Sequence, residues 1–177
     1  MAAFLLISFY FCGVSLISDY VNLELAAGAR MPTKATLGSI GYDVYALIDS
    51  SVIEAYEAHG NYCLDLPPKC VKMIRTGLSL ARISSHYYLQ VVSRSGLSAR
   101  GVWVANAPGI IDSDYKGEIC VLLYNSTSEP YRITNGDRIA QFLITPIIAD
   151  ISSSEASLSG LKLLAERSAG GFGSTGQ

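Results

Sequence analysis

Two aspartates and a tyrosine, Asp112, Asp114 and Tyr115, stand close together between Gly109 and Gly117. A carboxylate displayed where the backbone turns can act as a general base that takes a proton from a water molecule. An aromatic ring beside it can pack against a ring of the substrate. The types and spacing of these residues predict a catalytic carboxylate next to a platform for a cyclic group.

Apolar segments on both sides must position this stretch. Residues 101–106 and 118–125 both have the composition of a strand, so we interpret the stretch between them as a tight connection entering a β-hairpin. The second strand is apolar on both faces, which predicts cover on each side, inside a sandwich or at a subunit contact. One face carries Ile119, Val121 and Leu123, and the other carries Cys120, Leu122 and Tyr124.

A second polar motif runs from Ser93 to Gly96, where a predicted strand ends and a helical turn could begin. The guanidinium of Arg94, the hydroxyl of Ser95 and backbone N–H groups at a helix start suit an oxyanion such as phosphate. The structural alternative is a helix cap with an exposed arginine. The motif by itself leaves both interpretations open.

Two further segments could also serve a ligand, although each taken alone favours a structural or solubilising role. Residues 135–141 form a turn leading into a strand, which is most often structural, although Arg138 could pair with a carboxylate and orient it. Residues 169–177 are rich in glycine but lack the lysine and the following helix of a phosphate-binding P-loop. With Arg167 ahead of it and Phe172 within it, this tail is either a flap that closes over an anion or a disordered, solubilising terminus.

The composition of the 177-residue chain limits its class. The length predicts one domain, and 50% hydrophobic against 16% charged residues predicts a large subunit interface. A net charge of −2 gives no basic excess for binding a nucleic-acid backbone. The four cysteines form no C-x-x-C pair and the two histidines lack metal-ligand spacing, which favours the reduced thiols of an intracellular protein. We expect a cytoplasmic or nuclear location.

Residues 1–18 are strongly apolar and uncharged. They lack the basic start of a signal peptide, and the run is near the lower limit of length for a membrane span. An apolar arm, an extension from an upstream start, a targeting segment and a span all remain open, with membrane insertion the least favoured.

Many short strands with turn signals at 8–12-residue spacing predict an all-β barrel or a jelly roll. With the five motifs described below, we expect a distorted jelly-roll β-barrel. The short helical candidates are residues 95–100 and 158–164. We divide the chain into an apolar extension (1–18), a β-barrel domain (19–166) and a mobile, glycine-rich C-terminal arm (167–177). The other expected strands are residues 20–25, 41–46, 70–75, 78–83, 87–92 and 139–148, with an irregular pair between 49 and 66.

Two enzyme classes fit these residues poorly. The D-x-D spacing of Asp112 and Asp114 occurs as a metal-binding motif in sugar-nucleotide transferases, but those enzymes are usually larger α/β proteins. A serine hydrolase is disfavoured because the chain has no G-x-S-x-G motif and neither histidine has obvious catalytic partners.

Taken together, five segments resemble the five ordered motifs of the trimeric dUTPase family, over roughly residues 20–177. The sequence departs from the family pattern in the long connection at residues 49–69, and in having Ile40 for alanine, Val44 for leucine and Ser168 for glycine. The five segments are residues 41–46, 93–96, 106–117, 136–141 and 167–176.

The resemblance implies hydrolysis of dUTP to dUMP and pyrophosphate, with Mg2+ as cofactor. Asp112 would be the base that activates a water for attack on the α-phosphorus, and Arg138 would support it. Tyr115 would lie under the deoxyribose and reject UTP. Such an enzyme limits uracil incorporation into DNA and supplies dUMP.

The resemblance also assigns the contacts to uracil. Main-chain groups around Gly109 and Cys120 would read the base, with Asn106 acting through a water. Cytosine would bind more weakly, because it would leave a donor or acceptor of the site mismatched. The other substrate-binding residues expected in this hairpin are Ile110, Ile111, Ser113 and Asp114.

The triphosphate would be held by a different set of residues. Magnesium would sit on phosphate oxygens and water, with only a water-mediated contact to Asp43. Each site would draw on three subunits of a homotrimer, the tail coming from a different chain than the hairpin. The phosphate-binding residues would be Arg94, Ser95, Gly96, Gln141 and Arg167, and the closing tail would add Phe172, Gly173, Ser174 and Thr175.

Two other functions remain open. A dCTP deaminase-like enzyme on the same fold would need a different catalytic acid and usually has a less complete tail. A non-catalytic, nucleotide-responsive binding protein would bind dUTP without releasing pyrophosphate.

Overall fold

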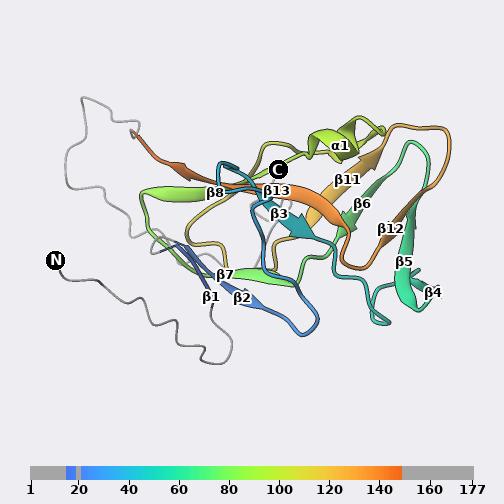
Figure 1. The fold of residues 1–177 in the computed structure, drawn as a ribbon, viewed down its shortest axis with the longest axis horizontal. Helices are drawn as coiled ribbons and strands as arrows, with labels where there is room; N and C mark the ends of the chain where they lie inside the picture. The colour runs from blue at the N-terminus through green and yellow to red at the C-terminus, as the bar shows by residue number, and fades with distance from the viewer. Residues whose placement is uncertain (1–14, 19–20, 149–177) are drawn as a thin grey trace, which may run out of the picture.

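The computed structural model describes residues 15–18 and 21–148, and strands dominate this part of the chain (Figure 1). The expected strands are present as β2, β3, β6, β7, β8 and β13, and the irregular pair is β4 and β5. The elements in chain order are β1 (Ser15–Ser18), β2 (Val21–Leu25), β3 (Tyr42–Tyr45), β4 (Tyr56–Ala58), β5 (Asn61–Leu66), β6 (Val71–Ile74), β7 (Leu78–Ile83), β8 (Tyr87–Val92), α1 (Ser95–Ser98), β9 (Val102–Val104), β10 (Gly109–Ile111), β11 (Val121–Asn125), β12 (Tyr131–Thr134) and β13 (Arg138–Pro146).

The strands form four antiparallel sheets in a jelly-roll-like arrangement, so the predicted all-β fold is confirmed. Strands that neighbour each other are often distant in sequence: β13 lies between β8 and β3. The sheets do not join into one closed barrel within the described residues. Their strand orders are β1-β2-β7, β10-β8-β13-β3, β6-β11-β9 and β12-β5-β4.

The hydrophobic core draws side chains from nearly all the strands, among them β8 and β13 and, below them in Figure 1, β2 and β7. Alternate side chains point inward, as the two-residue period of a strand requires. Leu23 and Leu78 from one side and Leu89 and Phe142 from the other are all buried. Burial of each such side chain stabilises the fold by about 1.5–3 kcal/mol, so this core fixes the sheet that carries β8 and β10.

β11 is fully covered on one face only. Its inward residues Val121 and Leu123 are at most 1% exposed, whereas its outward residues Leu122 and Tyr124 are partly buried. The Tyr124 ring packs edge-on against Trp103 of β9, with 5.2 Å between ring centroids. The sequence predicts that both faces of this strand are covered. Within one chain, only the inner face is fully covered.

The connection between β9 and β11 is not the tight hairpin turn that the sequence predicts. β9 and β11 do pair with each other, but β10 lies between them in sequence and pairs with β8 in another sheet. Gly109 lies opposite Val91, and a Cβ atom at Gly109 would be 3.4 Å from the Val91 Cβ. The segment crosses between sheets because its backbone N–H and C=O groups find partners on β8, and its glycine allows the close approach.

Part of the segment assigned to the apolar extension belongs to a sheet. β1 pairs with β2 in antiparallel register, so residue 18 is not the boundary between extension and sheet. The remainder of the extension, the helical candidate at 158–164 and the arm 167–177 lie outside the described residues. Within residues 21–148, no helix has the length and hydropathy needed to cross a bilayer.

Candidate active site

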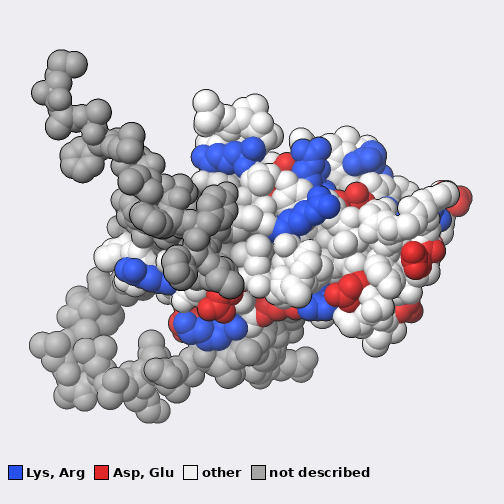
Figure 2. All heavy atoms as spheres, turned by 60° about the horizontal axis from the view of Figure 1, so that its bottom comes forward, with Lys and Arg blue, Asp and Glu red and all other residues white. Residues whose placement is uncertain are grey.

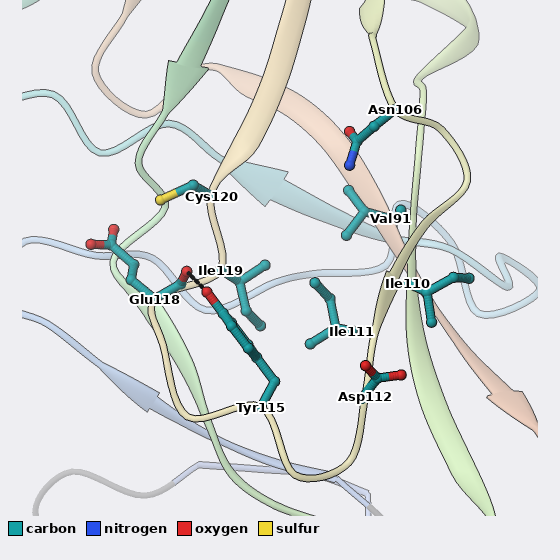
Figure 3. A pocket seen from close by; sticks show the side chains of 10 residues that line it. Val91, Asn106, Ile110, Ile111, Asp112, Tyr115, Glu118, Ile119 and Cys120 are labelled. Carbon is teal, nitrogen blue, oxygen red and sulfur yellow. Dashed lines mark hydrogen bonds between the residues drawn. The ribbon is translucent and has the colours of Figure 1, made fainter. Parts of the chain in front are cut away.

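One pocket of about 200 Å³ lies between β10 and the segment that leads into β11 (Figure 3). It is lined by the turn after β9, by β10 and the residues that follow it, by residues 118–120 and by one residue of β8. The lining residues are Val91, Asn106, Gly109, Ile110, Ile111, Asp112, Tyr115, Glu118, Ile119 and Cys120.

β10 forms one wall by pairing with β8. A Cβ atom at Gly109 would lie 3.3 Å from Nδ2 of Asn106, so glycine leaves room for the amide there. The Asn106 side chain lies next to Val91 and points toward the pocket (Figure 3). The Gly109 main chain and the Asn106 amide can thus both hydrogen-bond a planar ligand.

Asp112 and Tyr115 lie at the same end of the pocket, on the turn that follows β10 (Figure 3). The Tyr115 N–H donates to the Asp112 carbonyl oxygen at 3.1 Å and closes this turn. Asp112 is exposed, so solvent can reach its carboxylate, whereas the Tyr115 ring is partly buried and packs against the core. The predicted combination of a reachable carboxylate and a neighbouring aromatic wall is therefore present.

Residues 118–120 form the opposite wall and are fastened to the connection between β6 and β7. The Glu118 carboxylate accepts hydrogen bonds from the Gly77 N–H at 2.7 Å and from Arg75 Nε at 3.1 Å. The Ile119 N–H donates to the Leu78 carbonyl oxygen at 2.7 Å. The sequence predicts a strand over residues 118–125. Because these contacts hold residues 118–120 against the β6–β7 connection, β11 begins only at Val121.

The Cys120 thiol is held in its protonated form. Burial, followed by the negative charge of Glu118, raises the pKa of Cys120 to about 11, against the opposing charge of Arg75. The sulfur points away from Val91 and the centre of the pocket (Figure 3). A protonated thiol is a poor nucleophile, so Cys120 can serve a ligand through its main-chain groups.

A second polar cluster surrounds Asp43 on β3, which is 2% exposed. Arg94 Nε donates to one carboxylate oxygen at 2.8 Å, Arg138 Nη1 to the other at 3.1 Å, and Gln141 Nε2 adds a bond of 3.1 Å. Gln141 reaches Asp43 because the two residues are opposite each other in the pairing of β3 with β13. Burial opposes ionisation of Asp43, but these hydrogen bonds and the charge of Arg94 hold its pKa below the ordinary value.

Two residues of this cluster, Arg138 and Asp43, are predicted site residues. The sequence assigns Arg138 to the neighbourhood of Asp112, but within one chain its guanidinium contacts Asp43. The sequence also assigns Asp43 a water-mediated contact to Mg2+, but two guanidinium groups already neutralise this carboxylate, which disfavours a nearby cation. The described residues contain no group of three or more His, Cys, Asp or Glu that could hold a metal ion. They do not fit a magnesium ion held by the protein itself.

The other predicted residues fall into three groups. Ser113 and Asp114 lie on the turn between Asp112 and Tyr115 but do not line the pocket. Ser95 and Gly96 begin α1 and are exposed, while the preceding Arg94 is the N-cap residue of α1 and its side chain is partly buried in an ion pair with Asp43. The third group lies outside the described residues and comprises Arg167, Phe172, Gly173, Ser174 and Thr175.

Sequence reasoning missed three residues of the pocket, Val91, Glu118 and Ile119. Glu118 and Ile119 directly follow the motif that ends at Gly117, so their position in the chain was an available signal. Val91 enters the pocket only because β8 pairs with β10, and no sequence signal marks that pairing.

Charged side chains do not gather into one stripe on the face shown in Figure 2. Lys and Arg side chains form several separate groups there, with Asp and Glu side chains between and beside them. Proteins that track a nucleic-acid backbone usually carry a continuous basic patch or stripe. This face therefore offers no such pattern among the residues described.

Comparisons with known proteins point to one family. The family model described as dUTPase matches residues 27–176. The deoxyuridine 5'-triphosphate nucleotidohydrolase of Anaplasma marginale (strain St. Maries) is 41% identical over 162 residues, covering 88% of this chain and 95% of that relative. The protein of the same name from Treponema denticola is 42% identical over 157 residues, covering 88% of this chain and 97% of that relative.

Solved structures share the fold. A mutant dUTPase of Staphylococcus bacteriophage 80alpha with dUpNHpp has a TM-score of 0.61 and 22% identity, covering 80% of this chain and 100% of that chain. A mutant dUTPase from phage phi11 of S. aureus, described with a structural Mg(II) ion, has a TM-score of 0.59 and 22% identity, covering 77% of this chain and 99% of that chain. At these identities the likeness concerns the fold alone.

Proposed function

The chain belongs to the dUTPase family, and we propose that it works as a dUTP diphosphatase by directing a water molecule at Asp112 onto the α-phosphorus of dUTP. One observation carries the proposal. The exposed Asp112 carboxylate and the Tyr115 ring line the same pocket as the main chain of Gly109 and Cys120. A base, a wall for the sugar and groups that can read a planar base thus meet in one place.

The reaction needs a positioned water and a base. The water oxygen bonds to the α-phosphorus while the bond from that phosphorus to the oxygen bridging the β-phosphorus breaks. One proton of the water passes to the Asp112 carboxylate, and dUMP and pyrophosphate leave. Holding the water and the triphosphate in line supplies most of the acceleration, with base catalysis contributing about 10²–10⁴-fold.

Main-chain groups on the two walls would read the uracil. β10 would offer main-chain groups on the edge that does not pair with β8, and Cys120 would offer its own from across the pocket. Cytosine reverses one donor and one acceptor relative to uracil, so it would leave a buried group unpaired at a cost of about 1–3 kcal/mol. The Tyr115 ring beneath the deoxyribose would leave no room for the 2′-hydroxyl of UTP.

The triphosphate would extend beyond this pocket. A volume of about 200 Å³ is below the range of about 300–1,000 Å³ typical of pockets that enclose a whole drug-sized ligand. We assign the phosphates to Arg94, Ser95, Gly96 and Gln141, near the Asp43 cluster, and propose a homotrimer whose shared sites bring the cluster of one copy to the pocket of another. In that arrangement Arg138 would support Asp112 across the subunit boundary.

Magnesium enters this proposal as an ion carried on the phosphate oxygens of dUTP. The described residues provide no carboxylate cluster for it, and phosphate oxygens and water are the ligands it prefers. When bound there, it would neutralise charge on the phosphates.

The proposal is tested by measuring pyrophosphate release from dUTP, dCTP, dTTP and UTP by the purified full-length chain, with magnesium present. We expect release from dUTP and at least a hundredfold less from the other three. Ammonia release from dCTP would instead indicate a deaminase-like enzyme. Tight binding of dUTP without pyrophosphate release would indicate a non-catalytic, nucleotide-responsive protein.

A further inference from the structure

Both carboxylate oxygens of Glu118 are used to hold its own backbone in place. One accepts the Gly77 N–H at 2.7 Å, and the other accepts Arg75 Nε at 3.1 Å. Glu118 also forms an isolated antiparallel bridge with Ser79, and the next residue, Ile119, accepts a hydrogen bond from the Thr76 hydroxyl. The main chain at Glu118 is thus fixed to the β6–β7 connection from several directions.

Tyr115 is held by hydrogen bonds at its backbone and at the far end of its ring. Its backbone N–H donates to the Asp112 carbonyl oxygen, and its hydroxyl donates to the Glu118 carbonyl oxygen, each at 3.1 Å. Figure 3 shows the ring between these two anchors, with the Glu118 carboxylate pointing away from Asp112. Glu118 therefore contacts the Tyr115 side chain through its carbonyl group, while its carboxylate faces Arg75 and Gly77.

We propose that Glu118 is a positioning residue for sugar selection: its carboxylate, held by Arg75 and Gly77, fixes the carbonyl that fixes the Tyr115 ring. This inference rests on the proposed function, in which Tyr115 lies under the deoxyribose. Loss of the carboxylate lets residues 117 and 118 shift and the ring tilt, which opens space for a 2′-hydroxyl. The enzyme then accepts UTP more readily.

The experiment compares kcat/KM for dUTP with kcat/KM for UTP in wild type, Glu118→Ala and Glu118→Gln. We expect the dUTP/UTP ratio to fall about tenfold in Glu118→Ala, roughly the net contribution of one hydrogen bond. In Glu118→Ala, KM for dUTP should rise and kcat/KM for UTP should increase. The kcat for dUTP should stay within about threefold of wild type. Glu118→Gln keeps an acceptor oxygen, so its dUTP/UTP ratio should lie between those of wild type and Glu118→Ala.

Two further variants separate positioning from general damage. Tyr115→Phe removes the hydroxyl that Glu118 fixes, so adding Glu118→Ala to it should change the dUTP/UTP ratio by less than about twofold. Asp65→Asn is the matched control, because Asp65 also accepts a tyrosine hydroxyl, that of Tyr56 at 2.8 Å, and pairs with Arg132 at 3.7 Å, outside the pocket. Its ratio should equal that of wild type.

An unchanged dUTP/UTP ratio in both Glu118 variants overturns the inference. An equal loss of activity toward dUTP and UTP also overturns it. If Glu118→Ala does not fold, as judged by urea unfolding, the milder Glu118→Gln decides the same question. A wild-type chain that releases no pyrophosphate from dUTP overturns the proposed function and this inference together, whereas an active wild type with insensitive Glu118 variants overturns this inference alone.

Discussion

The Nε atom of Arg94 lies 2.8 Å from a carboxylate oxygen of Asp43, although the two residues are 51 positions apart in the sequence. The Asp43 side chain is 3% exposed and that of Arg94 is 18% exposed, so this ion pair is largely shielded from water. Arg138 completes it from a more exposed position at 3.1 Å. The pair orients two guanidinium groups beside the motif that we assign to phosphate.

Asp43→Asn should destabilise the folded chain by roughly 3 kcal/mol, because removing one member of a buried ion pair leaves the other charge uncompensated. Urea unfolding followed by circular dichroism measures this change. Asp65→Asn, which breaks an exposed ion pair, should cost less than about 1 kcal/mol. Equal stability of the two variants would contradict the structural role of Asp43.

Acid should weaken the fold through Asp43. Its pKa in the folded chain is lowered from the ordinary value of 3.8, so the unfolded state binds the proton more readily. The contribution of Asp43 is present above pH 3.8 and is lost as the pH falls from there through the folded-state value. Across that pH window, the free energy of unfolding measured in urea should depend less on pH in Asp43→Asn than in wild type. Identical slopes for the two proteins would contradict this role of Asp43.

Asp112→Asn should lower turnover of dUTP by roughly a hundredfold or more, since the amide cannot take a proton from the attacking water. Binding should be nearly intact, because the variant keeps the size and shape of the side chain. Stopped-flow or calorimetric titration with dUTP gives the affinity, and pyrophosphate release gives the turnover. A variant that turns over at the wild-type rate would rule out Asp112 as the base.

Cys120 should resist alkylation near neutral pH. With a pKa of about 11, only about one thiol in a thousand is ionised at pH 8, and the thiolate is the reactive form. Iodoacetamide labelling followed by mass spectrometry should modify the exposed Cys70 before Cys120, and the labelling of Cys120 should become faster as the pH rises. Labelling of Cys120 as fast as Cys70 at pH 8 would show that the thiol is not shielded as described.

Much of the fold follows from local patterns in the sequence. Alternating apolar residues and turn signals locate the strands, including the irregular pair β4 and β5, and the short helix at Ser95. The chemistry of the turn is also local, because Asp112 and Tyr115 are three residues apart and their turn is closed by a bond between them. These features depend on neighbours in the chain, which a sequence displays directly.

The structure alone decided which distant segments meet. The sequence determined that Asp112 and Tyr115 share a turn, but only tertiary pairing put β10 against β8 and brought Val91 into the pocket. It likewise joined Asp43 to Arg138, 95 positions away, and Glu118 to Arg75, 43 positions away. Strand partners and buried ion pairs are selected by the packing of the whole core, and alternation along one strand carries no information about which strand will lie beside it.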